Sequence, residues 1–169
     1  MPDQWATARV APTRGRSPFR VTKTAVQRVP DQFFLTLKMQ DKYRLLDANL
    51  NRAREGLRVI EDVVRFLYND KELSRKLRNI RHELSIITGK IYPRLLKSRD
   101  SENDVGLTFK EGKRKNLRDI LIANFRRAEE GIRVLEEFSR LISADAGDRL
   151  KKIRFKVYTI EKEIVTRIS

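Results

Sequence analysis

The stretch ANLNRAREGLRVIEDVVR, residues Ala48 to Arg65, decides the fold, because it recurs 75 residues later as ANFRRAEEGIRVLEEFSR, residues Ala123 to Arg140. In both copies apolar side chains return every three or four residues, the spacing that collects them on one face of an α-helix. The stripe of the first copy consists of Leu46, Leu50, Ala53, Leu57, Ile60, Val64 and Leu67. No segment shows the alternation typical of a strand, so the sequence predicts an all-α fold.

Each copy is followed by a second helical segment. The break YND at residues 68–70 precedes a helix that we expect to end around Gly89 to Pro93. Its expected buried face consists of Leu73, Leu77, Ile80, Leu84, Ile87 and Ile91. The later two helices are expected from about Leu117 to Ile142 and from about Asp145 to Ile168.

The second helices also repeat, because LRNIRHEL from Leu77 matches LKKIRFKV from Leu150. The repeated unit is therefore an αα-hairpin, with copies at about residues 43–92 and 117–168. Neither hairpin can bury its apolar stripe alone, so we predict a duplicated αα-hairpin that forms a four-helix bundle with pseudo-two-fold symmetry.

Composition limits the classes of partner. The 169 residues suit one domain, and a formal net charge of +15 favours anions such as nucleic acid, acidic lipid or small phosphorylated molecules. The chain has no cysteine and no apolar run of membrane-spanning length, so we expect a soluble, cytoplasmic protein that does not enter a membrane. Residues 1–38 lack periodicity and are expected to be a flexible basic leader or a mis-assigned start, which leaves 39–169 as the helical domain.

Three pairs of polar residues occupy matching positions near the apolar stripes. Their phases place the asparagines inside the stripe, the arginines on one edge and the glutamates on the other edge, where a side chain reaches both core and water. These pairs are Asn49 with Asn124, Arg52 with Arg127, and Glu61 with Glu136. A buried amide without a partner costs about 1 to 3 kcal/mol, so each Asn needs a backbone carbonyl, its repeat mate, an Arg or a ligand.

The outer face of the first copy reads as a salt-bridge ladder formed by Glu55, Arg58, Asp62 and Arg65. Both copies nevertheless keep arginine at Arg58 and Arg133, and the planar guanidinium suits phosphate or carboxylate. They also keep a glycine inside the helix, Gly56 and Gly131, although it costs about 1 kcal/mol relative to alanine. We expect close helix packing there rather than ligand contact.

Two further candidates lie outside the repeated motif. The segment 97–116 has little periodicity and holds Asp100, Glu102 and Asp104 close together, which would suit magnesium bound with substrate phosphates or an acidic, solvated turn. His82 is the one histidine and is either a general base or a structural residue. The sequence contains no P-loop or dinucleotide-binding motif, so the residues alone favour an anion-binding helical bundle without naming a reaction.

The segments LLDANLNRAREGLRVIEDVVRF, LRNIRHEL, RDSENDVG and ANFRRAEEGIRVLEE, in this order, closely resemble a family of small helical domains. That family is fused in front of thiamine-phosphate synthase in some bacteria and is free-standing in others. It is described as a hydroxymethylpyrimidine-phosphate kinase. The printed sequence carries no synthase barrel, and residues 1–38 fall outside the resemblance, so we expect no thiamine phosphate formation from this chain.

The resemblance implies an ATP-dependent transfer of the γ-phosphoryl group to hydroxymethylpyrimidine phosphate, with Mg²⁺ as cofactor and ATP as co-substrate. The catalytic candidates are then Arg52, Arg127, Arg58, Arg133 and His82. The substrate-binding candidates are Asn49, Asn124, Arg99, Glu61 and Glu136, and the metal candidates are Asp100 and Asp104.

Two alternatives remain at this point. A non-catalytic accessory domain would act with thiamine-phosphate synthase, and a basic helical module would bind nucleic acid. Acidic residues between the motif arginines disfavour the nucleic-acid module. The oligomeric state stays open, including a homo-oligomer.

Overall fold

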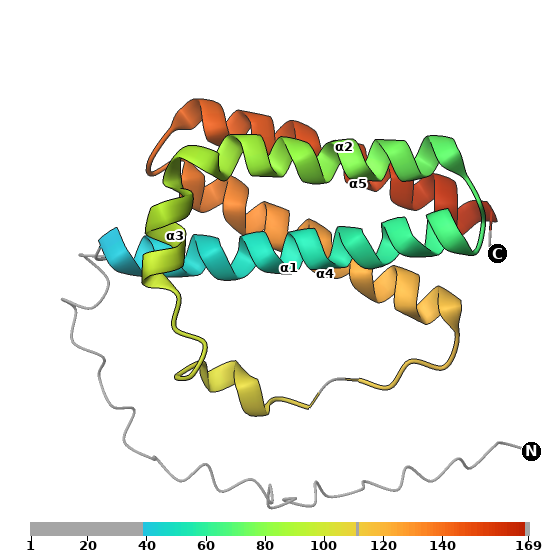
Figure 1. The fold of residues 1–169 in the computed structure, drawn as a ribbon, viewed down its shortest axis with the longest axis horizontal. Coiled ribbons are helices and arrows are strands. Elements are labelled where there is room, and N and C mark those ends of the chain that lie inside the picture. Colours follow the sequence, from blue (N-terminus) through green and yellow to red (C-terminus); the bar gives the residue numbers. More distant parts are fainter. Residues whose placement is uncertain (1–38, 111, 168–169) are drawn as a thin grey trace, which may run out of the picture. The chain divides into compact units, whose positions relative to one another are not determined.

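The computed structural model describes residues 39–110 and 112–167, and all structural statements below concern those residues. The helices are α1 (Met39–Phe66), α2 (Lys71–Thr88), η2 (Gly89–Ile91), α3 (Tyr92–Ser98), η3 (Val105–Thr108), α4 (Leu117–Ser139) and α5 (Ala144–Arg167). Figure 1 shows two antiparallel hairpins, α1 with α2 and α4 with α5, packed as a bundle. No strand occurs in the described ranges, so the all-α prediction is confirmed.

Local polar contacts define where the helices begin. Asp70 accepts a hydrogen bond from the Leu73 N–H at 2.9 Å and caps α2, while Asn116 accepts one from the Asp119 N–H at 2.8 Å and caps α4. The bond from Leu73 lowers the pKa of Asp70. Before this cap the chain turns through Asn69, whose φ of 51° lies in the left-handed region that asparagine tolerates. The YND break is thus a helix end, a left-handed turn and an N-cap.

The structure corrects the expected ends of the first and third helices and the expected role of Pro93. Leu67 is 60% exposed and lies beyond the end of α1, so it is not part of the buried stripe. The third expected helix ends at Ser139 rather than Ile142. The second expected helix, α2, ends at Thr88 with Gly89 as its C-cap, as expected, but Pro93 does not follow it as a stop. Pro93 lies in the first turn of the short helix α3, where its missing N–H costs nothing.

The apolar stripes form one core in which α1 and α4 make the most extensive contact. The predicted core residues Leu73, Leu77, Ile80 and Leu84 of α2 are buried, whereas Ile87 and Ile91 are only partly buried at its edge. Short helix α3 packs against α1 and places Leu95 in the same core.

The repeated glycines lie where α1 crosses α4. A Cβ on Gly56 would be 2.7 Å from the backbone oxygen of Asn124, and a Cβ on Gly131 would be 3.0 Å from the backbone oxygen of Asn49. Each glycine therefore receives the backbone of the other helix at the matching position, which confirms the close-packing interpretation. The contacts are reciprocal at this crossing, and two-fold symmetry of the whole bundle stays a prediction.

Helices α2 and α5 run antiparallel and are joined by ion pairs. Lys156 Nζ lies 2.7 Å from Glu83 Oε1, and Arg167 Nη1 lies 3.0 Å from Asp70 Oδ2. These exposed contacts contribute little energy individually, so the core holds the hairpins together. Within the described helices, none combines the length and apolar character needed to cross a bilayer. The expected leader, residues 1–38, lies outside the described residues.

Candidate functional site

A basic hollow lies between the two copies of the motif, and we call it the inter-repeat hollow. It has a volume of about 660 Å³ and receives residues from α1, from α4 and from the segment before α4. Its lining consists of Asn49, Arg52, Arg114, Ala123, Arg126, Arg127, Glu130, Gly131 and Val134. The structure therefore brings Arg52 and Arg127 to one hollow, and its described lining residues include four arginines and one acid, Glu130. Such a charge excess attracts anions.

A second hollow of about 230 Å³, the loop hollow, adjoins the first because Arg52 lines both. It is formed by α1 and the start of the loop that follows α3. Its lining consists of Arg44, Asp47, Ala48, Asn51, Arg52, Glu55, Arg99, Asp100, Ser101 and Asp104. The predicted residues Arg99, Asp100 and Asp104 are thus placed beside Arg52, which makes one continuous region of basic and acidic groups.

The loop is held on α1 by a bidentate ion pair. Arg99 Nε and Nη2 donate to the two carboxylate oxygens of Asp47 at 2.7 and 2.8 Å, and the Asp47 side chain is buried. The hydrogen bonds that Arg99 donates to Asp47, and the negative charge of Asp47, raise the pKa of Arg99 above its ordinary value. Arg99 therefore anchors the loop here, and a phosphate would have to share it with Asp47.

The two metal candidates also stabilise turns. Asp100 Oδ1 accepts hydrogen bonds from the backbone and side-chain nitrogens of Asn103, and Asp104 Oδ1 accepts one from the Gly106 N–H at 2.9 Å. These turn contacts use only the Oδ1 atom of each aspartate. The second carboxylate oxygen of Asp100, Oδ2, lies 3.6 Å from Arg44 Nη1. Among residues 39–110 and 112–167 no three acidic or histidine side chains form a metal cluster. Two carboxylates fit Mg²⁺ that takes its remaining ligands from phosphates and water.

The paired asparagines find backbone partners. Asn49 Nδ2 donates to the Leu45 carbonyl at 2.9 Å, and Asn124 Nδ2 donates to the Ile120 carbonyl at 2.8 Å. A backbone carbonyl is thus the partner of both amides, of which Asn49 is buried and Asn124 is only partly buried. Asn49 lines the inter-repeat hollow, whereas Asn124 is absent from its lining. Asn49 is consequently the asparagine whose side-chain oxygen could accept a hydrogen bond from an N–H group of a ligand in this hollow.

The paired glutamates are buried instead of reaching water, which corrects the expectation from the helical wheel. Glu61 Oε2 accepts from Arg81 Nε at 2.8 Å, and Glu136 Oε2 accepts from Arg154 Nε at 3.0 Å. Arg81 and Arg154 are matching residues of the second helices. The pairs join the helices within each hairpin, so neither glutamate lines the inter-repeat hollow or the loop hollow.

Three predicted catalytic residues lie elsewhere. Arg58 donates to Asp62 at 3.0 Å, and Arg133 Nη2 lies 2.7 Å from Glu137 Oε1, so both arginines belong to ion pairs along their own helices. His82 is exposed on α2. None of the three lines the inter-repeat hollow or the loop hollow.

Sequence reasoning missed five charged residues that line the two hollows: Arg44, Asp47, Arg114, Arg126 and Glu130. Arg126 lies within the repeated stretch, but the same position of the first copy is Asn51. Repetition of a residue type therefore could not select Arg126. Arg44 and Asp47 precede the repeated stretch. The signal that could have found Asp47 is an acidic residue next to an apolar stripe, which requires a cationic partner when buried.

A carboxyl pair links α4 to α5 close to Arg126. Burial, together with the charge of Glu161 and hydrogen bonding between the two carboxyls, raises the pKa of Glu129 to about 8. Glu129 Oε1 is buried without a hydrogen-bond partner among the described residues. The matching residues of the first hairpin are Arg54 and Thr88, so the carboxyl pair is particular to the second hairpin.

Comparison with known proteins identifies relatives of this chain. The ThiD2 family model matches residues 44–163. Thiamine-phosphate synthase of Nostoc punctiforme is 41% identical over 126 residues, covering 73% of this chain and 35% of that protein. The corresponding values are 39% over 125 residues (72% and 36%) for thiamine-phosphate synthase of Synechocystis sp. and 33% over 130 residues (75% and 35%) for that of Rhodopirellula baltica.

The chain therefore spans about a third of the length of the curated relatives it matches. No solved structure matches it.

Proposed function

The chain belongs to the ThiD2 family, and we propose that it serves thiamine biosynthesis by ATP-dependent phosphorylation of hydroxymethylpyrimidine phosphate to the diphosphate. One observation carries the proposal: Arg52 of α1 and Arg127 of α4, the matching arginines of the two copies, line one hollow. The basic lining of that hollow supports phosphate-bearing ligands rather than a neutral metabolite.

The reaction requires positioning and neutralisation of charge. An oxygen of the substrate phosphate attacks the γ-phosphorus of ATP, the new P–O bond forms, the bond to the bridging β–γ oxygen breaks, and ADP leaves. A phosphate monoester is already largely ionised near pH 7, so this acceptor needs no strong general base. The remote position of His82 is compatible with that requirement.

The residues of the two hollows divide into distinct roles. Arg52 and Arg127, with Arg126, would bind phosphate oxygens and neutralise charge at the transferring group. Asn49 would accept a hydrogen bond from an N–H group of the pyrimidine through its oxygen. Asp100 and Asp104 would hold Mg²⁺, which would supply further charge neutralisation to the phosphates when bound.

The test is an assay of ADP release that depends on the pyrimidine phosphate, with and without magnesium. We expect Arg52→Gln and Arg127→Gln to lower kcat/KM by about a hundredfold or more, since guanidinium groups at a transferring phosphoryl contribute at least that much. Arg58→Gln and Arg133→Gln are matched controls on the same two helices and should stay within about twofold of wild type. Wild-type turnover by folded Arg52→Gln and Arg127→Gln variants would remove the site.

The names and lengths of the relatives favour a second candidate, an accessory domain that acts with thiamine-phosphate synthase. This candidate predicts no ADP release from the protein alone, with or without the pyrimidine phosphate. It also predicts that the protein alters the rate of a separately added synthase. The two candidates are therefore separated by the same reaction mixture with the synthase omitted or present.

A further inference from the structure

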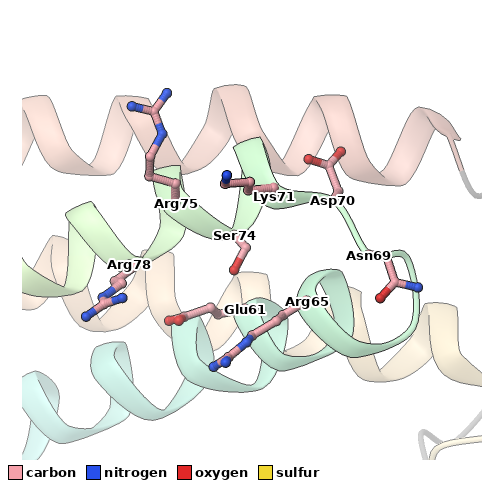
Figure 2. Close-up of a pocket in the computed structure, with 8 residues that line it drawn as sticks. All are labelled: Glu61, Arg65, Asn69, Asp70, Lys71, Ser74, Arg75 and Arg78. Carbon is pink, nitrogen blue, oxygen red and sulfur yellow. The ribbon is translucent and has the colours of Figure 1, made fainter.

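A third hollow lies at the end of the first hairpin, where α1 passes into α2 (Figure 2), and we call it the turn hollow. It has a volume of about 450 Å³ and is lined by Glu61, Arg65, Asn69, Asp70, Lys71, Ser74, Arg75 and Arg78. Arg65 lies thirteen residues beyond Arg52 on α1, which is roughly 20 Å along a helix axis. The turn hollow shares no lining residue with the inter-repeat hollow or the loop hollow.

The acids of the turn hollow already have cationic partners from outside it. Glu61 pairs with Arg81 at 2.8 Å, and Asp70 pairs with Arg167 at 3.0 Å. The four cations of its lining, Arg65, Lys71, Arg75 and Arg78, make no ion pair with any residue in 39–110 or 112–167. The hollow thus combines neutralised acids with uncompensated positive charge, which favours an anion.

At the matching place in the second hairpin, the arginine is held by ion pairs. Arg140, the match of Arg65, lies 3.1 Å from Asp148 Oδ1 and 3.7 Å from Glu136 Oε1. Its side chain also covers Gly147, where a Cβ would be 2.6 Å from Arg140 Cγ.

The first hairpin has opposite chemistry at the same positions. It carries Arg75 where the second hairpin carries Asp148, and Ser74 where the second carries Gly147. Lys71 likewise replaces Ala144. The carboxylate that would hold Arg65 is therefore missing, and two cations have been added. A helix face that is merely solvated does not require the opposite charge at Arg75, whose counterpart in the second hairpin, Asp148, forms an ion pair.

The side chains are arranged for a small ligand. Figure 2 shows Arg65 and Arg78 extending on either side of Glu61, while the guanidinium of Arg75 points away from Glu61. The Arg65 guanidinium carbon lies 4.8 Å from the Phe66 ring centroid, a stacking contact that leaves its N–H groups available. Lys71 and Ser74 lie on the first turns of α2 beside them.

We propose that the turn hollow binds the phosphate group of a small phosphorylated molecule. Arg65 and Arg78 supply guanidinium forks, which match phosphate geometry, and Lys71 supplies a point charge. Arg75 contributes by its positive charge and by the absence of the carboxylate found in the second hairpin. This site is additional to the one proposed for phosphoryl transfer and stands on different residues.

The experiment is a titration of the full chain with pyrophosphate, followed by amide NMR shifts at constant ionic strength. We expect saturable shifts at residues 71–74. Arg75→Asp restores the carboxylate of the second hairpin and should weaken this binding by tenfold or more, and Arg78→Gln should weaken it by about tenfold. Lys151→Gln changes the match of Arg78 in the second hairpin and should leave the affinity unchanged.

Unchanged affinity in both Arg75→Asp and Arg78→Gln would overturn the proposal, as would shifts at residues 71–74 that sodium chloride alone reproduces. Both substitutions are at exposed positions, so the folded state is expected to persist, and circular dichroism checks this. Shifts near Arg52 and Arg127 report the inter-repeat hollow separately. A failure there would count against the proposed phosphoryl transfer and leave the turn hollow unaffected.

Discussion

The first hairpin joins Glu61 to Arg81 with an Oε2–Nε distance of 2.8 Å, and the second joins Glu136 to Arg154 at 3.0 Å through the same atoms. Around this shared contact the hairpins differ. Among the described residues, Glu136 also pairs with Arg133 at 3.0 Å and Arg140 at 3.7 Å, whereas Glu61 pairs only with Arg58, at 4.0 Å, in addition to Arg81. The duplicated ion pair therefore carries more cationic support in the second hairpin.

The comparison separates two kinds of position in a duplicated bundle. Positions that join helices across the core, such as Gly56 with Gly131, are the same in both hairpins because either copy needs them for packing. Matching positions at the exposed edge of the hairpins, such as Arg75 and Asp148, carry opposite charges. Differences at this edge are consequently where the hairpins could acquire separate ligands, as proposed for the turn hollow.

The largest expected effect comes from removing the shared glutamate. Glu136→Gln leaves Arg154, whose side chain is only 12% exposed, without its charge partner, and should lower the free energy of unfolding by about 3 kcal/mol. Glu61→Gln should cost less, about 2 kcal/mol, because Arg81 is more exposed and can be hydrated. Urea denaturation with an unchanged m-value measures both.

The matched control replaces the whole pair, Glu136→Leu with Arg154→Met, which should recover a large part of the lost stability because no charge is left buried. Equal losses of stability in Glu136→Gln and Glu61→Gln would contradict the inferred difference between the hairpins.

The next effect concerns the helix crossing. Gly56→Ala should lower the free energy of unfolding by about 2 kcal/mol, because its Cβ would approach the Asn124 carbonyl to 2.7 Å and α1 would have to move. Gly131→Ala, with 3.0 Å to the Asn49 carbonyl, should lose about 1 kcal/mol. Thermal unfolding of both variants tests whether the crossing is tighter on one side.

Gly89→Ala provides the control, since nothing lies within 4 Å of its Cβ and its backbone is α-helical. It should gain about 0.5 kcal/mol through lower entropy of the unfolded chain. If Gly56→Ala also gained stability, close packing would not be the reason for the repeated glycines.

Periodicity and repetition were sufficient to predict the four long helices, because burial of an apolar stripe dominates where such helices form. The same reasoning failed at Pro93, which was interpreted as a stop although proline is equally suited to the first turn of a helix. It also failed at Leu67, where the helix ends one residue earlier and the stripe loses its register.

The site was predictable only in part. Arg52 and Arg127 could be selected because they repeat on a stripe edge, and they do line one hollow. Arg58 and Arg133 repeat equally well but lie beside carboxylates one turn away, and repetition cannot separate these two cases. The position of the loop depended on the Arg99–Asp47 contact, which joins residues 52 apart in sequence and has no periodic signal.

A smaller effect is expected for the carboxyl pair of the second hairpin. The folded pKa of Glu129, about 8, exceeds its ordinary value of 4.5, so the folded state binds the proton more tightly than the unfolded state. Its stabilisation is complete below about pH 4.5 and is lost as the pH rises to about 8. Glu129→Gln should therefore remove part of this decline and raise the melting temperature at pH 8 by a few degrees.

Arg54→Gln at the matching position of the first hairpin is the control, and its melting temperature should keep the wild-type dependence on pH. The raised pKa would be contradicted if the stability of the wild-type protein rose between pH 5 and pH 8 and Glu129→Gln showed the same dependence on pH.

The smallest expected difference lies in the exposed ion pairs. Arg133→Gln removes contacts to Glu136 and Glu137 at 3.0 and 2.7 Å, while Arg58→Gln removes one short contact, to Asp62 at 3.0 Å. Arg133 and Arg58 are both about half exposed, so each contact within a helix should contribute about 0.3 to 0.5 kcal/mol even though Glu136 itself is buried. Arg133→Gln should therefore cost about 0.8 kcal/mol and Arg58→Gln about 0.4 kcal/mol. Both losses should shrink in 1 M salt, where charges are screened over about 3 Å, and denaturation at low and high salt measures this. Losses that persist in salt would mean that these arginines stabilise the helices through their aliphatic stems instead of their charges.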